Sequence, residues 1–296
     1  MINMHFYENW SPGKTKYEPI REFCLCEKVD VEYMRSLIRR DFGGGISRIV
    51  KKAKQTSGNM VLLYGAVVLL LLVFQTALGK AGKYIADSFS YVKIDPHNAY
   101  AWNFAHHITV LILALFTILI LSKPLKSNFG LCPGDTKTGL RYAVIYTAIF
   151  AGITLAVHIL MAANSSLPVY AFPLNKNNIF GSLCFQLFLS GPAEELLFRA
   201  LPITILMIVS GKSVEVKRGI SPETIIAAFL FAIAHIRWSL SPFAVEADYF
   251  QLIYAFAQGI VSGKAYQDTR SVFYPMFMHS ISNVLMVGTG YLFFLL

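Results

Sequence analysis

Apolar side chains run along this chain in long blocks separated by short polar segments. The first block, Met60–Gly79, contains no charged residue. Because the hydrocarbon core of a bilayer is about 30 Å thick, an apolar helix of about 20 residues crosses it. The pattern predicts about seven transmembrane helices, with roughly six to eight compatible with the block lengths. The predicted spans are Met60–Gly79, Trp102–Ser122, Tyr142–Ala163, Ile179–Ser210, Ser221–Trp238, Tyr249–Gly263 and Ser271–Leu295.

The fourth and fifth blocks contain residues that predict a kink and a helix start. The fourth contains Gly191-Pro192 and Pro202. Proline removes a helical hydrogen bond, so this block is either one long kinked helix or two segments joined at 191–192. The fifth block opens with Ser221-Pro222-Glu223. This order predicts a helix start, with a capping serine, proline at the first helical position and an acid near the positive end of the dipole.

The residues before the first span are different in character. Residues 1–59 are polar and of mixed charge, and the segment 30–41 places Val31, Met34, Leu37 and Ile38 on one helical face. This spacing predicts a short amphipathic helix that lies on the membrane surface.

The composition agrees with a membrane protein. The chain has 296 residues, of which 55% are hydrophobic and only 15% are charged, whereas soluble domains carry about 25% charged residues. The mean hydropathy of +0.52 also excludes a disordered chain. We therefore expect an all-α fold, a polytopic transmembrane helical bundle with a short polar N-terminal region.

The net charge of +9 comes from basic residues that lie beside the predicted spans. The segment 39–54 carries Arg39, Arg40, Arg48, Lys51, Lys52 and Lys54 directly before the first span. Positively charged flanks stay on the cytoplasmic side, so we expect a cytoplasmic N-terminus and, with seven crossings, a C-terminus outside. The expected partner of this charge is the lipid bilayer and not nucleic acid.

Three charged residues interrupt this pattern, because Glu194, Glu195 and Arg199 lie within an apolar block. Each costs about 2.5–3.5 kcal/mol near the centre of a span. Glu195 and Arg199 are four residues apart and share a helical face, so they can pair. Glu194 lies about 100° further round the helix and needs another polar partner.

Two later spans supply such partners. His235 follows Phe231 by four residues, and Asn283 follows His279 by the same spacing. Intramembrane ionisable residues face the bundle interior, so we expect these groups to meet Glu194 around a water-filled pocket. Glu194 and His235 could then move the protons of a water molecule. His279 and Asn283 could stabilise the oxyanion that forms when water attacks a carbonyl group.

The remaining histidines in or beside the spans are not assigned to this pocket. We expect His106, His107 and His158 to make interhelical or interfacial contacts. Phe231 is expected to pack beneath His235. The chain contains neither the H-E-x-x-H motif of zinc proteases nor the G-x-S-x-G motif of serine hydrolases.

The motifs E-E-x-x-x-R, F-x-x-x-H and H-x-x-x-N, in this order on successive apolar segments, resemble the CPBP family. This is the Abi or type II CAAX-protease superfamily, with glutamic intramembrane endopeptidases and bacteriocin-processing or immunity proteins. The resemblance covers about residues 179–290 and implies a metal-free site in a cavity within the bilayer. It implies that Glu194 and His235 activate water, that His279 and Asn283 form the oxyanion hole, and that Glu195 and Arg199 are a structural or positioning pair.

With this resemblance, the chain divides into a basic N-terminal region (1–59), three spans (60–163) and a CPBP-like catalytic core (179–295). We expect an intramembrane endopeptidase in a bacterial plasma membrane that acts on a membrane-associated peptide or protein without a cofactor. Three alternatives remain. The first is a non-catalytic immunity or interaction protein on the same scaffold, and the second is a zinc protease that uses Glu194, His235 and His279 as ligands. The third is a proton-coupled transporter, which the absence of repeated halves disfavours.

Overall fold

The computed structural model describes residues 57–211, 219–240 and 243–296. The predicted amphipathic helix at 30–41 and the basic segment 39–54 lie outside these residues. The main helices are α3 (Ser57–Asp87), α4 (Ala101–Leu125), α5 (Thr136–Ala163), α6 (Lys176–Phe185), α7 (Gly191–Glu195), α8 (Leu201–Ser210), α9 (Pro222–Ala234), α10 (Tyr249–Thr269) and α11 (Phe273–Leu295).

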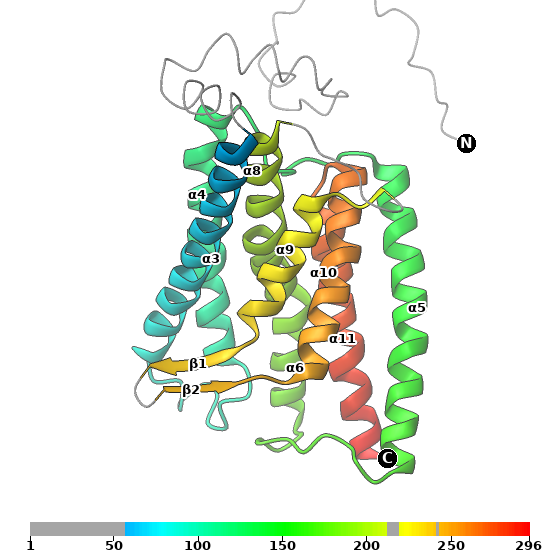
Figure 1. The fold of residues 1–296 in the computed structure, drawn as a ribbon. Coiled ribbons are helices and arrows are strands. Elements are labelled where there is room, and N and C mark those ends of the chain that lie inside the picture. Colours follow the sequence, from blue (N-terminus) through cyan, green and yellow to red (C-terminus); the bar gives the residue numbers. More distant parts are fainter. Residues whose placement is uncertain (1–56, 212–218, 241–242) are drawn as a thin grey trace, which may run out of the picture.

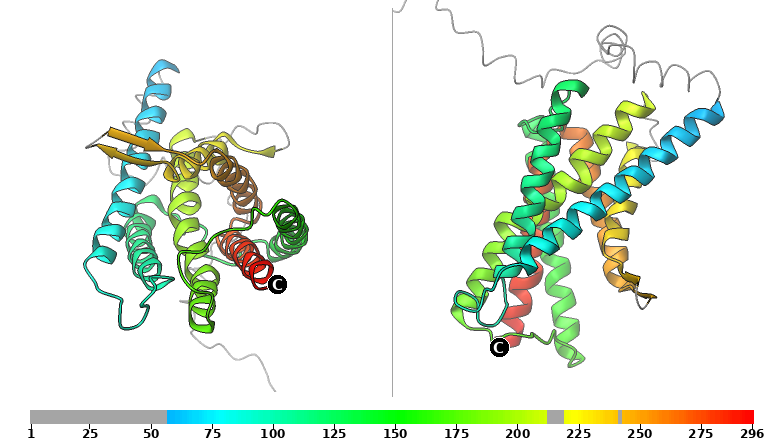
Figure 2. Two further views of the ribbon diagram at one scale, coloured as in Figure 1. Left: turned by 90° about the horizontal axis from the view of Figure 1, so that it is seen from below. Right: turned by 90° about the vertical axis from the view of Figure 1, so that its left-hand side faces the viewer.

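The helices run alongside one another as a bundle (Figure 1). Seen along the bundle, the segment that contains α6, α7 and α8 lies in the middle, with α3 and α4 on one side and α10, α11 and α5 on the other (Figure 2). The start of α3 and the end of α11 lie at opposite ends of the bundle. This placement agrees with an odd number of crossings.

Four of the described helices are long and apolar enough to cross a membrane. They are Met60–Asp87, Ala101–Leu125, Thr136–Ala163 and Phe273–Leu295. The predicted all-α membrane bundle is therefore confirmed, while the count of about seven crossings stays a prediction.

The fourth apolar block is one continuous helical segment from Lys176 to Ser210, so the alternative of two joined segments is wrong. Two π-helical segments, Gln186–Ser190 and Leu196–Ala200, interrupt its α-helical geometry. Each ends two residues before a proline, Pro192 or Pro202. Proline has no N–H to donate, and a wider π turn accommodates the missing hydrogen bond without breaking the helix. The first π segment and α7 bring Ser190 and Glu194 into the centre of the bundle.

The fifth predicted span is shorter than expected. Its start is confirmed, because the Oγ of Ser221 accepts the N–H of Thr224 and Pro222 is the first helical residue. The helix α9 ends at Ala234, however, and not at Trp238. Its 13 residues extend about 20 Å, which is less than the thickness of a bilayer core. Its C-terminal end therefore places His235 inside the bundle.

The chain after α9 forms a small antiparallel hairpin of β1 (Arg237–Leu240) and β2 (Phe243–Glu246). The sequence Arg-Trp-Ser-Leu alternates polar and apolar residues, which is the period of a strand and not of a helix. The hairpin connects α9 to α10, which continues through the predicted end at Gly263 to Thr269.

The loop before α4 is held by a buried carboxylate. Asp95 accepts the backbone N–H groups of Ala99, Tyr100 and Ala101 at 2.9, 2.7 and 2.8 Å. Burial raises the pKa of Asp95, but these N–H donors lower it more, so the net pKa lies below its ordinary value. The ionised carboxylate therefore fixes the start of the helix that carries His106 and His107.

The helices α7 and α11 approach closely at Gly191. A Cβ atom on this residue would lie 2.6 Å from the carbonyl oxygen of Met276 and would also meet the hydroxyl of Ser280. Only glycine permits this approach, and it brings Glu194 and Glu195 next to His279.

Gly191→Ala is predicted to lower the free energy of unfolding by about 1–3 kcal/mol, because the added methyl group pushes α7 away from α11. Denaturant unfolding in detergent micelles measures this change. The matched control is Gly152→Ala in α5, where a Cβ has no neighbour within 4 Å. Its expected effect is neutral or slightly stabilising. Equal losses in the two variants would contradict the close-packing argument.

Candidate functional site

The two adjacent glutamates of α7 point in different directions, as their helical positions require. Glu195 is fully buried, with 0% of its side chain exposed, whereas 22% of the Glu194 side chain is exposed. Glu195 therefore belongs to the packed interior and Glu194 to the wall of an internal pocket.

Glu195 joins two buried cationic or basic groups. Its Oε2 lies 3.2 Å from the Nε of Arg199, whose side chain is also 0% exposed. Its Oε1 accepts a hydrogen bond of 2.7 Å from the Nδ1 of His279. The guanidinium of Arg199 stacks on the ring of Phe231, 4.0 Å from its centroid. The predicted pairing of Glu195 with Arg199 is thus present, and it also fixes the orientation of His279.

Phe231 supports both histidines of the predicted site. Its ring meets that of His235 edge to face, with 4.7 Å between the centroids, and that of His279 with 5.9 Å. The expected packing of Phe231 against His235 is therefore present in the structure.

His235 caps the short helix α9. Its Nδ1 lies 2.9 Å from the carbonyl oxygen of Phe231, and a carbonyl only accepts, so Nδ1 carries a proton and donates it. The other ring nitrogen, Nε2, remains available to the pocket. The early end of α9 thus places the imidazole on the wall of the pocket that Glu194 also lines.

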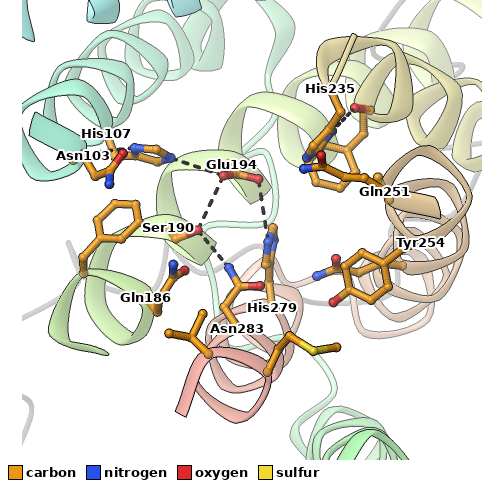
Figure 3. A pocket seen from close by; sticks show the side chains of 16 residues that line it. Asn103, His107, Gln186, Ser190, Glu194, His235, Gln251, Tyr254, His279 and Asn283 are labelled. Atoms are coloured by element: carbon orange, nitrogen blue, oxygen red, sulfur yellow. Dashed lines mark hydrogen bonds and ion pairs between the residues drawn. The ribbon is translucent and has the colours of Figure 1, made fainter. Parts of the chain in front are cut away.

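Asn283 reaches the same pocket from α11. Its Nδ2 donates to the Oγ of Ser190 at 3.0 Å, and this hydroxyl lies 3.5 Å from the Oε1 of Glu194. The Nε2 of His279 lies 3.7 Å from the other oxygen, Oε2 (Figure 3). The structure therefore brings the predicted residues of α7, α9 and α11 together.

The cavity between these side chains has a volume of about 330 Å³. Glu194, His235, His279 and Asn283 all line it, as the sequence led us to expect. Much of the remaining wall is polar, which suits water and a peptide backbone. The other lining residues are Asn103, His107, Phe185, Gln186, Ser190, Phe231, Gln251, Tyr254, Ala255, Gln258, Met286 and Val287.

A second, more apolar pocket adjoins this cavity. We call it the α5–α10 groove, and its volume is about 690 Å³. The apolar face of α5 that includes Ile145, Ile149 and Ile153 forms one wall. Tyr254, Gln258 and Met286 line both pockets. An apolar chain in the groove would therefore lie beside the polar cavity.

His107 is the main group that sequence reasoning missed. It lies on α4 with its Nε2 at 3.3 Å from the Oε1 of Glu194. The contact is interhelical, as expected, but its partner is the site carboxylate. The partners lie 87 positions apart, so no helical spacing reveals them. The sequence did carry a signal, because Asn103 lies four residues before His107 on the same helical face, and both side chains line the cavity. His158, by contrast, bonds the carbonyl of Thr154 on its own helix and does not line the pocket.

Among the residues that the structure describes, no group of three His, Cys, Asp or Glu side chains could hold a metal ion. The absence of a cofactor stays a prediction, which chelation tests.

The fold and the pocket define a class of protein: a helical membrane bundle with a carboxylate, three imidazoles and five amides around an internal cavity. Residues 176–285 match the family described as Type II CAAX prenyl endopeptidase Rce1-like. The match confirms the CPBP resemblance and, with the apolar helices, supports an integral membrane protein of the CAAX protease type. Neither a curated protein nor a solved structure matches the chain.

Glu195→Ala is predicted to lower the free energy of unfolding by about 3–5 kcal/mol, because it leaves the charge of Arg199 buried without its partner. The matched variant Glu194→Ala should lose less than about 1.5 kcal/mol, since Glu194 faces a cavity. Thermal or denaturant unfolding of both variants in micelles gives the comparison. Similar losses would mean that the two glutamates do not differ in structural role.

Proposed function

We propose that this chain is an intramembrane endopeptidase that hydrolyses a peptide bond with a water molecule activated by Glu194 and His235. One observation carries the proposal. Glu194, His235, His279 and Asn283, which come from three different helices or their ends, line one polar cavity inside an apolar bundle. The match to a CAAX endopeptidase family over residues 176–285 supports the same class of reaction.

In this mechanism the water binds between the Oε2 of Glu194 and the Nε2 of His235. Oε2 has only a distant neighbour in His279, at 3.7 Å. A neutral His235 presents a lone pair at Nε2, because its Nδ1 proton is donated to Phe231. Two proton acceptors on the wall of one cavity are therefore available to this water, which supports general base catalysis.

His279 and Asn283 would bind the oxygen of the scissile carbonyl as it becomes negative. The Nδ1 proton of His279 is donated to Glu195, so its Nε2 donates only from the imidazolium form, which lies between the carboxylates of Glu194 and Glu195. The amide of Asn283 is held by Ser190 and retains a second N–H. Fixed donors of this kind stabilise an oxyanion by about 2.7–4 kcal/mol each.

The protons balance through one cycle. Glu194 and His235 accept one proton from water as its oxygen bonds to the carbonyl carbon. The tetrahedral intermediate then collapses, the C–N bond breaks, and the same proton is delivered to the leaving amine. The products are a carboxylic acid and an amine, and no redox partner is needed.

The proposed substrate is a membrane-associated peptide or protein, and the α5–α10 groove supports this choice. An apolar groove that shares three lining residues with the cavity can receive the hydrocarbon part of such a substrate. We further propose a bacterial plasma membrane as the location. The basic residues before the first span support a cytoplasmic N-terminus.

Cleavage of an internally quenched peptide with a farnesylated cysteine in a CAAX sequence provides the test. Glu194→Gln and His235→Ala should each lower kcat at least about a hundredfold, because each removes a proton acceptor. His158→Ala is the matched control, since this buried histidine lies outside the cavity. Purified protein in lipid nanodiscs is suitable for the measurement.

The same assay separates the rival functions. Wild-type activity that persists after exhaustive chelation contradicts the zinc protease, whereas loss of activity that zinc restores contradicts the metal-free mechanism. A biological phenotype that survives both Glu194→Gln and His235→Ala would favour the non-catalytic immunity or interaction protein.

The groove generates a prediction of its own. Ile149→Trp should raise KM for the farnesylated peptide about tenfold, or roughly 1.4 kcal/mol, because the larger side chain fills the space for the hydrocarbon. The side chain of Ile149 lines the groove and is 59% exposed. Ile159→Trp is the control, because this residue of the same helix is 51% exposed but does not line the groove. Equal KM values for the two variants would place the hydrocarbon elsewhere.

A further inference from the structure

The two carboxylate oxygens of Glu194 have different surroundings. Oε1 lies 3.3 Å from the Nε2 of His107 and 3.5 Å from the Oγ of Ser190. Oε2 lies 3.7 Å from the Nε2 of His279, which is an ion-pair distance and not a hydrogen bond. One oxygen is therefore held and the other is left open to the cavity.

The proton positions on His106 follow from its neighbours. Its Nε2 lies 3.2 Å from the carbonyl oxygen of Gly79 in α3. A carbonyl only accepts, so Nε2 of His106 carries the proton and, in the neutral ring, Nδ1 is an acceptor. This Nδ1 lies 3.1 Å from the Nδ1 of His107.

The state of His107 follows in turn. Its Nδ1 faces the acceptor on His106 and also the carbonyl oxygen of Asn103 at 3.0 Å. Nδ1 of His107 must therefore carry a proton. A hydrogen bond between the Nε2 of His107 and the carboxylate of Glu194 then needs one proton between the two atoms. This proton belongs either to an imidazolium form of His107 or to the carboxyl group of Glu194.

The ring of His107 is fixed on its other sides as well. It meets the ring of Phe185 edge to face, with 4.8 Å between the centroids. The contacts from Gly79 through His106 connect α3 and α4 to Glu194 on α7. The group that holds the Oε1 oxygen thus comes from outside residues 176–285, the part of the chain that matches the protease family.

We propose that His107 is a positioning residue that holds the Oε1 oxygen of Glu194 through one shared proton, so that Oε2 stays directed at the substrate water. This role rests on the proposed function for its effect on catalysis, but the shared proton itself does not depend on that function. Other titratable groups face Glu194 from the surrounding helices. They are His235 at the end of α9, Tyr254 on α10 and His279 on α11.

The test compares His107→Ala, His107→Gln and the control His158→Gln. In the wild type, the Nδ1 of His158 bonds the carbonyl oxygen four residues earlier at 2.9 Å, as the Nδ1 of His107 does at 3.0 Å. His158 does not contact Glu194, so it is a matched control. Glutamine at position 107 keeps an N–H donor near the Nε2 position, whereas alanine removes it. Thermal unfolding of each variant verifies that the bundle remains folded.

With the farnesylated peptide, His107→Ala should lower kcat about tenfold to a hundredfold while KM changes less than about threefold, which is the effect of losing a hydrogen bond to a charged group. His107→Gln should recover most of this loss, and His158→Gln should match the wild type. A purely structural role would lower the activity of the alanine and glutamine variants alike or would change KM, and either result would overturn the proposal.

A second measurement needs no substrate. Dicyclohexylcarbodiimide reacts with the neutral form of a carboxyl group, and mass spectrometry gives the labelled fraction of Glu194. At pH 7 the labelled fraction should change at least about threefold in His107→Ala and stay unchanged in His158→Gln, because the shared proton sets the state of the carboxyl. An unchanged fraction in His107→Ala overturns the shared proton. If His107→Ala changes the labelled fraction of Glu194 but the wild type cleaves no peptide, the proposed function is refuted and the shared proton is supported.

Discussion

The ion pair between Glu195 and Arg199 is the interaction on which the centre of this bundle depends. Both side chains are 0% exposed in an apolar interior, where an isolated charge is strongly unfavourable. Arg199 also stacks on Phe231, and Glu195 also accepts the Nδ1 proton of His279. Three helical segments therefore meet at one buried ionic cluster. Its geometry determines where the neighbouring residue, Glu194, can point.

The interrupted helix from Lys176 to Ser210 places this cluster. Its two π-helical segments precede Pro192 and Pro202, so the prolines change the helical pitch without ending the helix. Gly191 then lets α7 approach α11 closely enough for Glu195 to reach His279. The features that would weaken an ordinary helix, two prolines and a glycine, are here those that bring the acidic residues to the histidines.

The cavity joins two environments that a membrane hydrolase has to combine. Glutamine, asparagine, serine and histidine side chains surround Glu194 and suit water and a peptide backbone, whereas the adjoining α5–α10 groove is apolar. Three histidines of the cavity have the same hydrogen-bond pattern. His107, His235 and His279 each donate Nδ1–H to a fixed acceptor, so that Nε2 is left for the cavity. Each ring orientation is thus set by a neighbouring group that does not itself react.

The sequence alone determined the class of fold and pointed to most residues of the proposed site, because charges in an apolar block are conspicuous and a spacing of four places residues on one helical face. Glu194, His235, His279 and Asn283 were found in this way. The tertiary structure decided what spacing does not encode. The helix α9 ends at Ala234 instead of the predicted Trp238, and π turns kept the fourth block continuous. Likewise, His107 meets Glu194 across 87 positions, because contacts between helices depend on how they pack and not on any period along the chain.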